Sequence, residues 1–241
     1  MGFWHANLRK FVDTWTSTGP RSALRDATDM FLSPVYRHIN RSFDIKRNVN
    51  TSGSIPLADL TLADESFDRS RDKRKYEPTS VVTLRRMISV LPADLSDFVF
   101  VDIGSGKGRA LFVASEYNFK RIIGVEFSRE LHSIAKENLS AYDNKEQKCF
   151  NIDLILDDAR NLVMPEESSV FFLYNPFLGA EDVLSHVLNK IEESFAANPR
   201  KMYFLYLNPR QSNLFSDLPF VRPIESRRFA LRRAIIYESI D

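Results

Sequence analysis

Three glycines and two carboxylates stand at a spacing that could bind a small polar molecule. The segment Asp102-Ile103-Gly104-Ser105-Gly106-Lys107-Gly108 directly follows the apolar run Phe98–Val101. Because glycine has no Cβ atom, this loop can turn sharply and let a ligand approach its backbone. Glu126 closes the next apolar run, where a carboxylate can accept hydrogen bonds from both hydroxyls of a ribose. We therefore expect the loop and Glu126 to bind one nucleoside-containing ligand.

The elements around this loop are predicted to form a βαβ unit. Phe98–Val101 and Arg121–Val125 are short apolar runs, typical of strands buried on both faces, and Arg109–Tyr117 between them is predicted to be helical. Dinucleotide sites use the spacing G-x-G-x-x-G and hold a pyrophosphate. Here the third glycine comes one residue too soon, and the carboxylate of Asp102 would repel a pyrophosphate but attract a cationic amino group. The pattern therefore disfavours a nicotinamide oxidoreductase.

This arrangement resembles the first motif of the class I S-adenosylmethionine (SAM) methyltransferases. The resemblance implies that SAM is the cofactor and that Glu126 is the acid that binds its ribose. It also implies an α/β fold of the class I methyltransferase type, with a seven-stranded, mostly parallel sheet whose last strand is antiparallel. The loop residues implied to contact the cofactor are Asp102, Gly104, Ser105, Gly106 and Gly108.

A second segment narrows the resemblance. Tyr76-Glu77-Pro78-Thr79 precedes a predicted helix, Ser80–Leu91, and then the glycine loop. This order looks like a subset of class I enzymes that includes the non-SET histone lysine methyltransferases and the mitochondrial lysine methyltransferases of the ATP-synthase c-subunit type. The resemblance implies that Tyr76 and Thr79 form part of a lid over the cofactor. The alternative is an ordinary turn at the start of a helix.

A pair of acids follows the third predicted strand, Cys149–Leu156. In class I methyltransferases an acid at this place binds the adenine amino group, and Asp158, directly before Ala159, is the best match. Asp157 is the alternative, and both acids could instead only cap the following turn.

The fourth predicted strand, Val170–Tyr174, ends in Asn175-Pro176-Phe177. Carbonyl groups of such a segment can accept hydrogen bonds from an N–H, and an aromatic ring can contact a planar acceptor or an ammonium. The segment resembles the Asn/Asp-Pro-Pro-Tyr/Phe motif of amino-group methyltransferases, although the second proline is missing. We expect Asn175, Pro176 and Phe177 to act in catalysis; the alternative is a strand-ending turn with a buried phenylalanine.

Residues 1–75 have the character of a helical extension that ends in a charged hinge, with the SAM-binding domain at residues 76–241. Trp4, Leu8, Phe11 and Trp15 recur at helical spacing, and a second helix is predicted over Ser22–Leu32, with an end before Pro34. Val35–Phe43 could continue helically after this proline. The first helix is expected to pack on the domain, with a membrane surface or a partner as the alternative. We expect the extension to cover the cofactor or acceptor pocket.

The remaining predicted elements complete the fold. Ser128 can cap a helix that ends near Tyr142, and another helix spans Glu181–Phe195. A fifth strand, Lys201–Leu207, precedes a terminal hairpin made of Val221–Glu225 and Arg232–Glu238. The hairpin region carries five arginines that could hold an anionic acceptor or form a solvated face: Arg222, Arg227, Arg228, Arg232 and Arg233.

Composition excludes several classes of function. The 241 residues have a formal net charge of +1, which favours neither nucleic acid nor an anionic membrane as a partner. No run approaches the roughly 18 apolar residues of a membrane span. The four histidines lack metal-ligand spacing, so no metal is expected, and Cys149, the only cysteine, is expected to be a core residue. One cysteine and no secretory leader favour a reducing, cytoplasmic location.

Methyl transfer needs alignment and loss of a proton but no protein nucleophile, which agrees with this inventory. We therefore expect a SAM-dependent methyltransferase that acts on nitrogen, with a protein lysine as the first candidate acceptor. The alternatives are a methyltransferase of a small metabolite or lipid-linked substrate and a non-catalytic SAM-fold protein that binds a partner.

Overall fold

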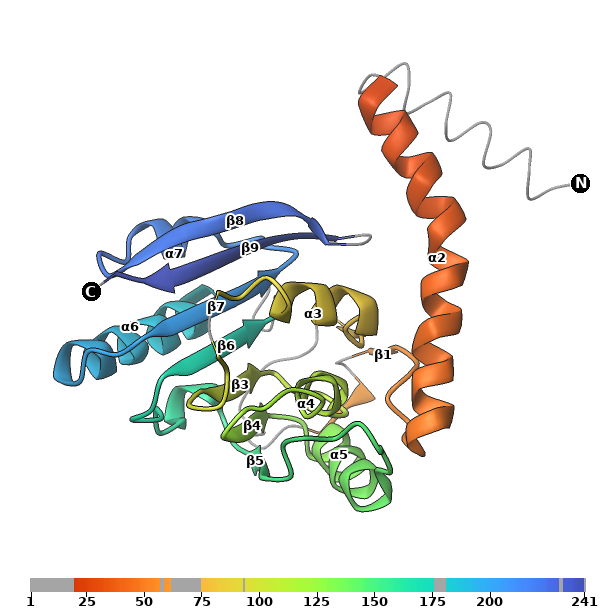
Figure 1. Ribbon diagram of the computed structural model, residues 1–241, viewed down its shortest axis with the longest axis horizontal. Helices are drawn as coiled ribbons and strands as arrows, with labels where there is room; N and C mark the ends of the chain where they lie inside the picture. The colour runs from red at the N-terminus through yellow and green to blue at the C-terminus, as the bar shows by residue number, and fades with distance from the viewer. Residues whose placement is uncertain are drawn as a thin grey trace, which may run out of the picture.

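The computed structural model describes residues 20–56, 59–61, 75–92, 94–175, 181–229 and 232–240. Within them, helices cover both faces of a central sheet, and a long helix near the N-terminus leads into it from one side (Figure 1). This layering is typical of α/β proteins, in which each face of a mostly parallel sheet must be covered.

Seven strands of the described chain form the central sheet, as predicted. From one edge to the other they are β5 (Ile152–Leu156), β4 (Arg121–Glu126), β3 (Val99–Ile103), β6 (Ser169–Leu173), β7 (Met202–Leu207), β9 (Arg232–Ser239) and β8 (Val221–Phe229). The pairs β5–β4, β4–β3, β3–β6 and β6–β7 are parallel, whereas β9 runs antiparallel to both β7 and β8. The sheet therefore has the class I methyltransferase order, with the last strand inserted antiparallel. The hairpin strands are longer than predicted.

Two hydrophobic clusters, one on each face, hold the layers together. Phe100 and Phe172 point to the face covered by α3 and α4, whereas Val101 and Phe171 point to the face covered by α6 and α7. This alternation follows from the two-residue period of a strand. The helices are α3 (Val81–Ile88), α4 (Arg109–Ala114), α5 (Arg129–Ala141), α6 (Glu181–Ala197) and α7 (Asn213–Ser216), with a 3-10 turn η2 (Ala159–Asn161).

Two helices begin at serine caps. The hydroxyl oxygen of Ser80 accepts a hydrogen bond from the Thr83 amide at the start of α3, and that of Ser128 accepts one from the Leu131 amide at the start of α5. Each cap satisfies a backbone donor that the helix itself leaves unpaired. The predicted cap at Ser128 is confirmed. Cys149 is buried as expected, although it lies before β5 rather than at the start of the strand.

The extension differs most from expectation. One helix, α2 (Pro20–Arg47), runs through Pro34, so the predicted stop before this proline is wrong. Pro34 is exposed, and the last turns of α2 bury Phe43 and Asp44 against the domain. These tertiary contacts outweigh the loss of one helical hydrogen bond at a proline.

After α2 the chain adds a small unpredicted ribbon. The strand β1 (Ile55–Pro56) pairs antiparallel with β2 (Lys75–Tyr76), which brings the end of the extension to the first residue of the predicted SAM-binding domain. The aromatic helix predicted around Trp4 to Trp15 lies outside the described residues, and so does the charged hinge predicted over Asp64–Lys75, except for Lys75 in β2. None of the described helices is long and apolar enough to cross a membrane.

Candidate functional site

The predicted site residues gather at the carboxyl edge of the parallel strands. Asp102 is the penultimate residue of β3, Glu126 ends β4, Asp158 follows β5 and Asn175 follows β6. Neighbouring parallel strands end at the same edge, and the spatial order is Asp158, Glu126, Asp102, Asn175. Residues separated by up to 73 positions in the sequence therefore lie along one line across four adjacent strands.

The glycine loop has the backbone geometry that its sequence predicts. Gly104, Gly106 and Gly108 have φ angles of 85°, 56° and 89°. These values lie in the left-handed region that only glycine occupies without strain. The loop is joined to β4 because the amides of Gly104 and Ser105 both donate to the Val125 carbonyl at 2.9 Å. The loop is therefore held on the strand that carries Glu126.

Glu126 is buried and accepts two backbone hydrogen bonds. The Gly106 amide donates to Oε2 at 2.7 Å, and the Ser128 amide donates to Oε1 at 2.8 Å. Burial raises the pKa of Glu126 from its ordinary value, against the lowering effect of these amides. Each carboxylate oxygen retains lone-pair capacity for a further donor such as a ribose hydroxyl.

Asp102 is a buried carboxyl group whose surroundings suit a cation. Its residue is 3% exposed, and no donor among the described residues forms a hydrogen bond to its carboxylate. Burial, together with the negative charge of Glu126, raises the pKa of Asp102 well above the ordinary carboxyl range. An ammonium group at this edge would offset that burial cost, so the residues present fit the methionine end of SAM.

Tyr76 lies directly against the glycine loop. A Cβ atom added to Gly106 would lie 2.3 Å from Cε2 of the Tyr76 ring, so the ring occupies the space that a side chain at position 106 would need. The Tyr76 hydroxyl donates to the Thr51 carbonyl at 2.8 Å, and burial raises its pKa. Thr79 is buried, and its carbonyl accepts a hydrogen bond from Arg109. Both predicted lid residues therefore lie beside the loop.

The two acids after β5 already act as caps. The Asp158 carboxylate accepts a hydrogen bond from the Arg160 amide at 2.8 Å and pairs with the Arg160 side chain at 2.6 Å. The Asp157 carboxylate accepts from the Asp158 amide at 2.7 Å and from the Asn161 side chain at 2.8 Å. Ala159 is buried beneath this turn. The arrangement gives both acids the capping role that the sequence left open as an alternative.

Asn175 has an unusual backbone. Its φ is 45°, a left-handed value that asparagine tolerates better than most residues. Its side-chain Oδ1 accepts a hydrogen bond from the Arg210 amide at 3.3 Å, which links the end of β6 to the segment after β7. Pro176 and Phe177 lie outside the described residues.

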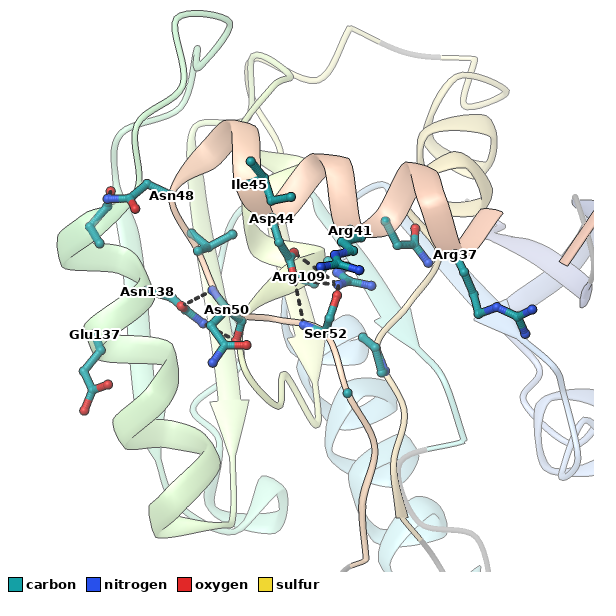
Figure 2. Close-up of a pocket in the computed structure, with 15 residues that line it drawn as sticks. Arg37, Arg41, Asp44, Ile45, Asn48, Asn50, Ser52, Arg109, Glu137 and Asn138 are labelled. Carbon is teal, nitrogen blue, oxygen red and sulfur yellow. Dashed lines mark hydrogen bonds and ion pairs between the residues drawn. The ribbon is translucent and has the colours of Figure 1, made fainter. Parts of the chain in front are cut away.

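The predictions missed a buried ion pair beside the glycine loop. Arg109, the first residue of α4, is 2% exposed and donates to both oxygens of Asp44 on α2, at 3.1 Å and 3.2 Å. Figure 2 shows this pair with Ser52, at the edge of a groove of about 890 Å³ between α2 and α5. The only local signal was a charged residue in an otherwise apolar helix, and nothing in the sequence pointed to a partner 65 positions away.

The arginines of the hairpin region have partners on the protein surface. Arg222 pairs with Glu238 at 2.8 Å, Arg227 with Glu225 at 3.7 Å, and Arg232 with Glu77 at 3.8 Å. Arg233 donates to the Ser226 hydroxyl at 3.2 Å. Most of these contacts belong to a charged surface. Arg232 connects the hairpin to the segment that carries Tyr76.

Comparisons with known proteins agree with this geometry. Residues 101–194 match the family model for a methyltransferase domain, a range that includes the glycine loop, Glu126, Asp158 and Asn175. Among curated proteins, no similar sequence was found.

Solved structures are similar to this chain at low sequence identity. TrmN from Thermus thermophilus is 18% identical with a TM-score of 0.50, over 67% of this chain and 49% of that chain. The ribosomal protein L11 methylase from Lactobacillus delbrueckii subsp. bulgaricus is 12% identical with a TM-score of 0.47, over 66% of this chain and 77% of that chain. An RNA methyltransferase from Salinibacter ruber, solved with S-adenosyl-L-homocysteine, is 16% identical with a TM-score of 0.46, over 68% and 95%.

The sheet order and the family match lead to one conclusion: the chain has the class I methyltransferase fold and carries a methyltransferase domain at residues 101–194.

Proposed function

We propose that this enzyme methylates a nitrogen atom and that its acceptor is a lysine side chain of a protein. The observation that carries this proposal is the place of Asn175, directly after β6 and beside the strand that carries Asp102. Bound SAM supplies the methyl group and a neutral thioether as leaving group. The chain's own residues therefore only have to bind the cofactor and the acceptor, align them and exclude water.

The order of side chains along the sheet edge sets the direction in which the cofactor lies. Asp158, in addition to its bonds to Arg160, would take the adenine, Glu126 the ribose and Asp102 the methionine ammonium. Tyr76 and Thr79 would cover the glycine loop. These positions run from β5 through β4 to β3, so β6 is the next strand in line. The reactive end of the cofactor site therefore faces the strand that leads to Asn175.

The surroundings of Asn175 favour an amine acceptor. The neighbouring Tyr174 hydroxyl donates to Oε2 of Glu77 at 3.3 Å, which joins an aromatic ring and a carboxylate near the end of β6. Burial alone would raise the pKa of Glu77, but Lys75, Arg232 and Tyr174 lower it overall and keep the group ionised at neutral pH. The carboxylate already holds one lysine ammonium, that of Lys75, at 2.9 Å.

The carboxylate, the aromatic ring and Asn175 have different roles toward an incoming lysine. A carboxylate and an aromatic ring attract an ammonium group. The Asn175 amide oxygen can then accept a hydrogen bond from the amine after its extra proton has left to solvent, and so turn the nitrogen lone pair toward the methyl group.

The test is labelling with tritiated SAM. A lysate from cells that lack this protein is incubated with purified enzyme, divided into protein, RNA and small-molecule fractions, and counted. We expect label in the protein fraction that is recovered as methyl-lysine after hydrolysis. Asn175→Gly serves as the matched enzyme control and should lower the initial rate of labelling about 10²–10³-fold. Label only in the small-molecule or RNA fraction would contradict the lysine assignment and identify the acceptor class instead.

A further inference from the structure

The buried ion pair between α2 and α4 belongs to a chain of contacts that reaches the cofactor loop. Besides Asp44, Arg109 donates through Nε to the Thr51 hydroxyl at 2.6 Å and through Nη2 to the Ser52 hydroxyl at 2.8 Å. Its Nη1 donates to the Thr79 carbonyl at 3.4 Å. Each nitrogen of the guanidinium is therefore bonded to a residue that precedes α3 in the chain.

Asp44 holds the same loop from the other side. Its Oδ2 accepts from the amides of Thr51, at 3.1 Å, and Ser52, at 2.8 Å, and its Oδ1 accepts from the Thr51 hydroxyl at 2.6 Å. Figure 2 shows the Asp44 and Arg109 side chains meeting beside Ser52. The free-energy cost of desolvating such a buried ion pair is offset only when both charged groups form further hydrogen bonds. Here both partners form several.

The loop held in this way is the support of Tyr76. The Thr51 carbonyl accepts the hydrogen bond from the Tyr76 hydroxyl at 2.8 Å, and the Ser52 carbonyl accepts one from Lys107 Nζ at 2.9 Å. The same Lys107 ammonium lies 5.3 Å from the centre of the Tyr76 ring. The tyrosine ring is therefore fixed at its hydroxyl end by Thr51 and packs at its edge against Gly106.

This series of contacts, which begins at the Asp44–Arg109 pair, ends at Gly106 in the cofactor site. Gly106, whose missing Cβ leaves room for the Tyr76 ring, also donates through its amide to Glu126. A shift of the Thr51 carbonyl would move the ring, and with it the loop backbone beside the carboxylate that we assign to ribose. No step in this chain requires Asp44 or Arg109 to touch the cofactor.

We propose that the Asp44–Arg109 pair is a positioning device that sets SAM affinity by holding Thr51, and through it Tyr76, against the glycine loop. This inference rests on the proposed place of Tyr76 in the cofactor site and is independent of the acceptor. Failure of the lysine-labelling experiment would therefore leave it untouched, since its own readout is cofactor binding alone.

The test is a double-mutant cycle on SAM affinity, measured by calorimetry on the full chain. Asp44→Asn weakens one end of the contact chain, and Tyr76→Phe removes only the hydroxyl at the other end. We expect each variant to weaken SAM binding about 3- to 10-fold, the range for loss of one hydrogen bond. Because both substitutions disrupt the same series of contacts, the double variant should bind SAM only slightly more weakly than the single variant with the lower SAM affinity. Thr51→Val, which removes the hydroxyl between Asp44 and Arg109, replaces Asp44→Asn in the cycle if that variant does not fold.

The matched control separates positioning from general stability. Arg47 also joins the extension to the domain, through Glu116 at 3.3 Å and Glu146 at 2.7 Å, but it has no contact with Thr51 or Tyr76. Arg47→Gln should lower the melting temperature and leave the SAM dissociation constant unchanged. Additive losses in the double variant, or unchanged SAM affinity in folded Tyr76→Phe, would overturn the proposal. So would an equal loss of SAM affinity in Arg47→Gln.

Discussion

The backbone amide of Gly106 donates a 2.7 Å hydrogen bond to the Glu126 carboxylate. The middle glycine of the loop and the acid at the end of β4 are therefore one structural unit before any cofactor binds. Because Ser128 donates to the other oxygen of the same carboxylate, Glu126 also joins the loop to the start of α5. A substitution at this position will act on the shape of the site as well as on the ribose contact.

Glu126→Ala should weaken SAM binding by about 1.5–3 kcal/mol, the usual scale for hydrogen bonds to a charged group. It should also lower the melting temperature, because two buried amides lose their acceptor. Calorimetry with SAM and thermal unfolding without it measure the two effects. Glu130→Ala is the matched control, since Glu130 is the next acid along the chain and bonds to Thr61 rather than to the glycine loop. Unchanged SAM affinity in a folded Glu126→Ala protein would show that this residue does not bind the ribose.

SAM binding should release a proton because Asp102 is buried with a raised pKa. The native carboxyl keeps its proton to higher pH than the unfolded one, so the ligand-free protein loses stability as pH rises from about 4 through the native pKa. A cationic ammonium favours the ionised carboxylate, and SAM affinity should therefore increase with pH across the same window. Calorimetry in two buffers of different ionisation enthalpy counts the protons released.

Asp102→Asn is the control for this pH dependence. It should weaken SAM binding and remove the part of the pH dependence that Asp102 contributes, while the part due to Glu126, whose pKa is also raised, remains. An identical pH profile in the variant would assign the proton release to another group.

Gly106→Ala should abolish SAM binding, since the new methyl group would overlap the Tyr76 ring. Gly53→Ala is a matched control, because Gly53 also has a positive φ, 88°, but the nearest atom to its added Cβ is Lys107 Nζ at 3.9 Å. Both variants carry the left-handed strain of about 1–2 kcal/mol in unfolding free energy. Equal SAM affinity in the two variants would show that the contact between Tyr76 and Gly106 has no part in cofactor binding.

Asn175→Gly is expected to slow methyl transfer about 10²–10³-fold, the cost of losing one preorganised hydrogen bond, while SAM affinity stays within a few-fold. Glycine is the right substitution because φ at this position is 45°, where alanine would add strain of its own. Single-turnover transfer to the labelled acceptor measures the rate, and calorimetry measures SAM affinity.

Asn208→Gly provides the matched control for Asn175, because Asn208 directly follows β7 and has a similar φ of 52°. It should change neither quantity. If Asn175→Gly transfers methyl groups at the wild-type rate, the segment after β6 is only a turn and has no catalytic role. If the variant loses its SAM affinity, Asn175 belongs to the cofactor pocket instead.

Several parts of this protein could be predicted because the signal is local. The glycine spacing after β3 predicted a sharp turn, and Gly104, Gly106 and Gly108 make this turn with left-handed φ angles. Ser128 was recognised as a helix cap from the polar residue before an apolar pattern, and its side chain caps α5. Alternating strands and helices predicted the parallel sheet, and the resemblance of the glycine loop to a known family supplied the strand order.

Other features were decided only by contacts between distant segments. Pro34 predicted a helix end, but burial of Phe43 and Asp44 against the domain carries α2 on to Arg47. The acids after β5 were left with two alternatives, and the structure shows both bonded as caps.

The sequence by itself determined the cofactor loop, because glycine angles, strand periods and helix caps depend on residues that are near neighbours in the chain. The tertiary structure alone decided what supports that loop. Asp44 and Arg109 are ordinary charged residues in their own segments, and neither residue type nor spacing distinguishes them from solvated surface charges. They become a buried pair only when the last turns of α2 bring Asp44 to the start of α4, since a low-dielectric interior requires each charge to find a partner.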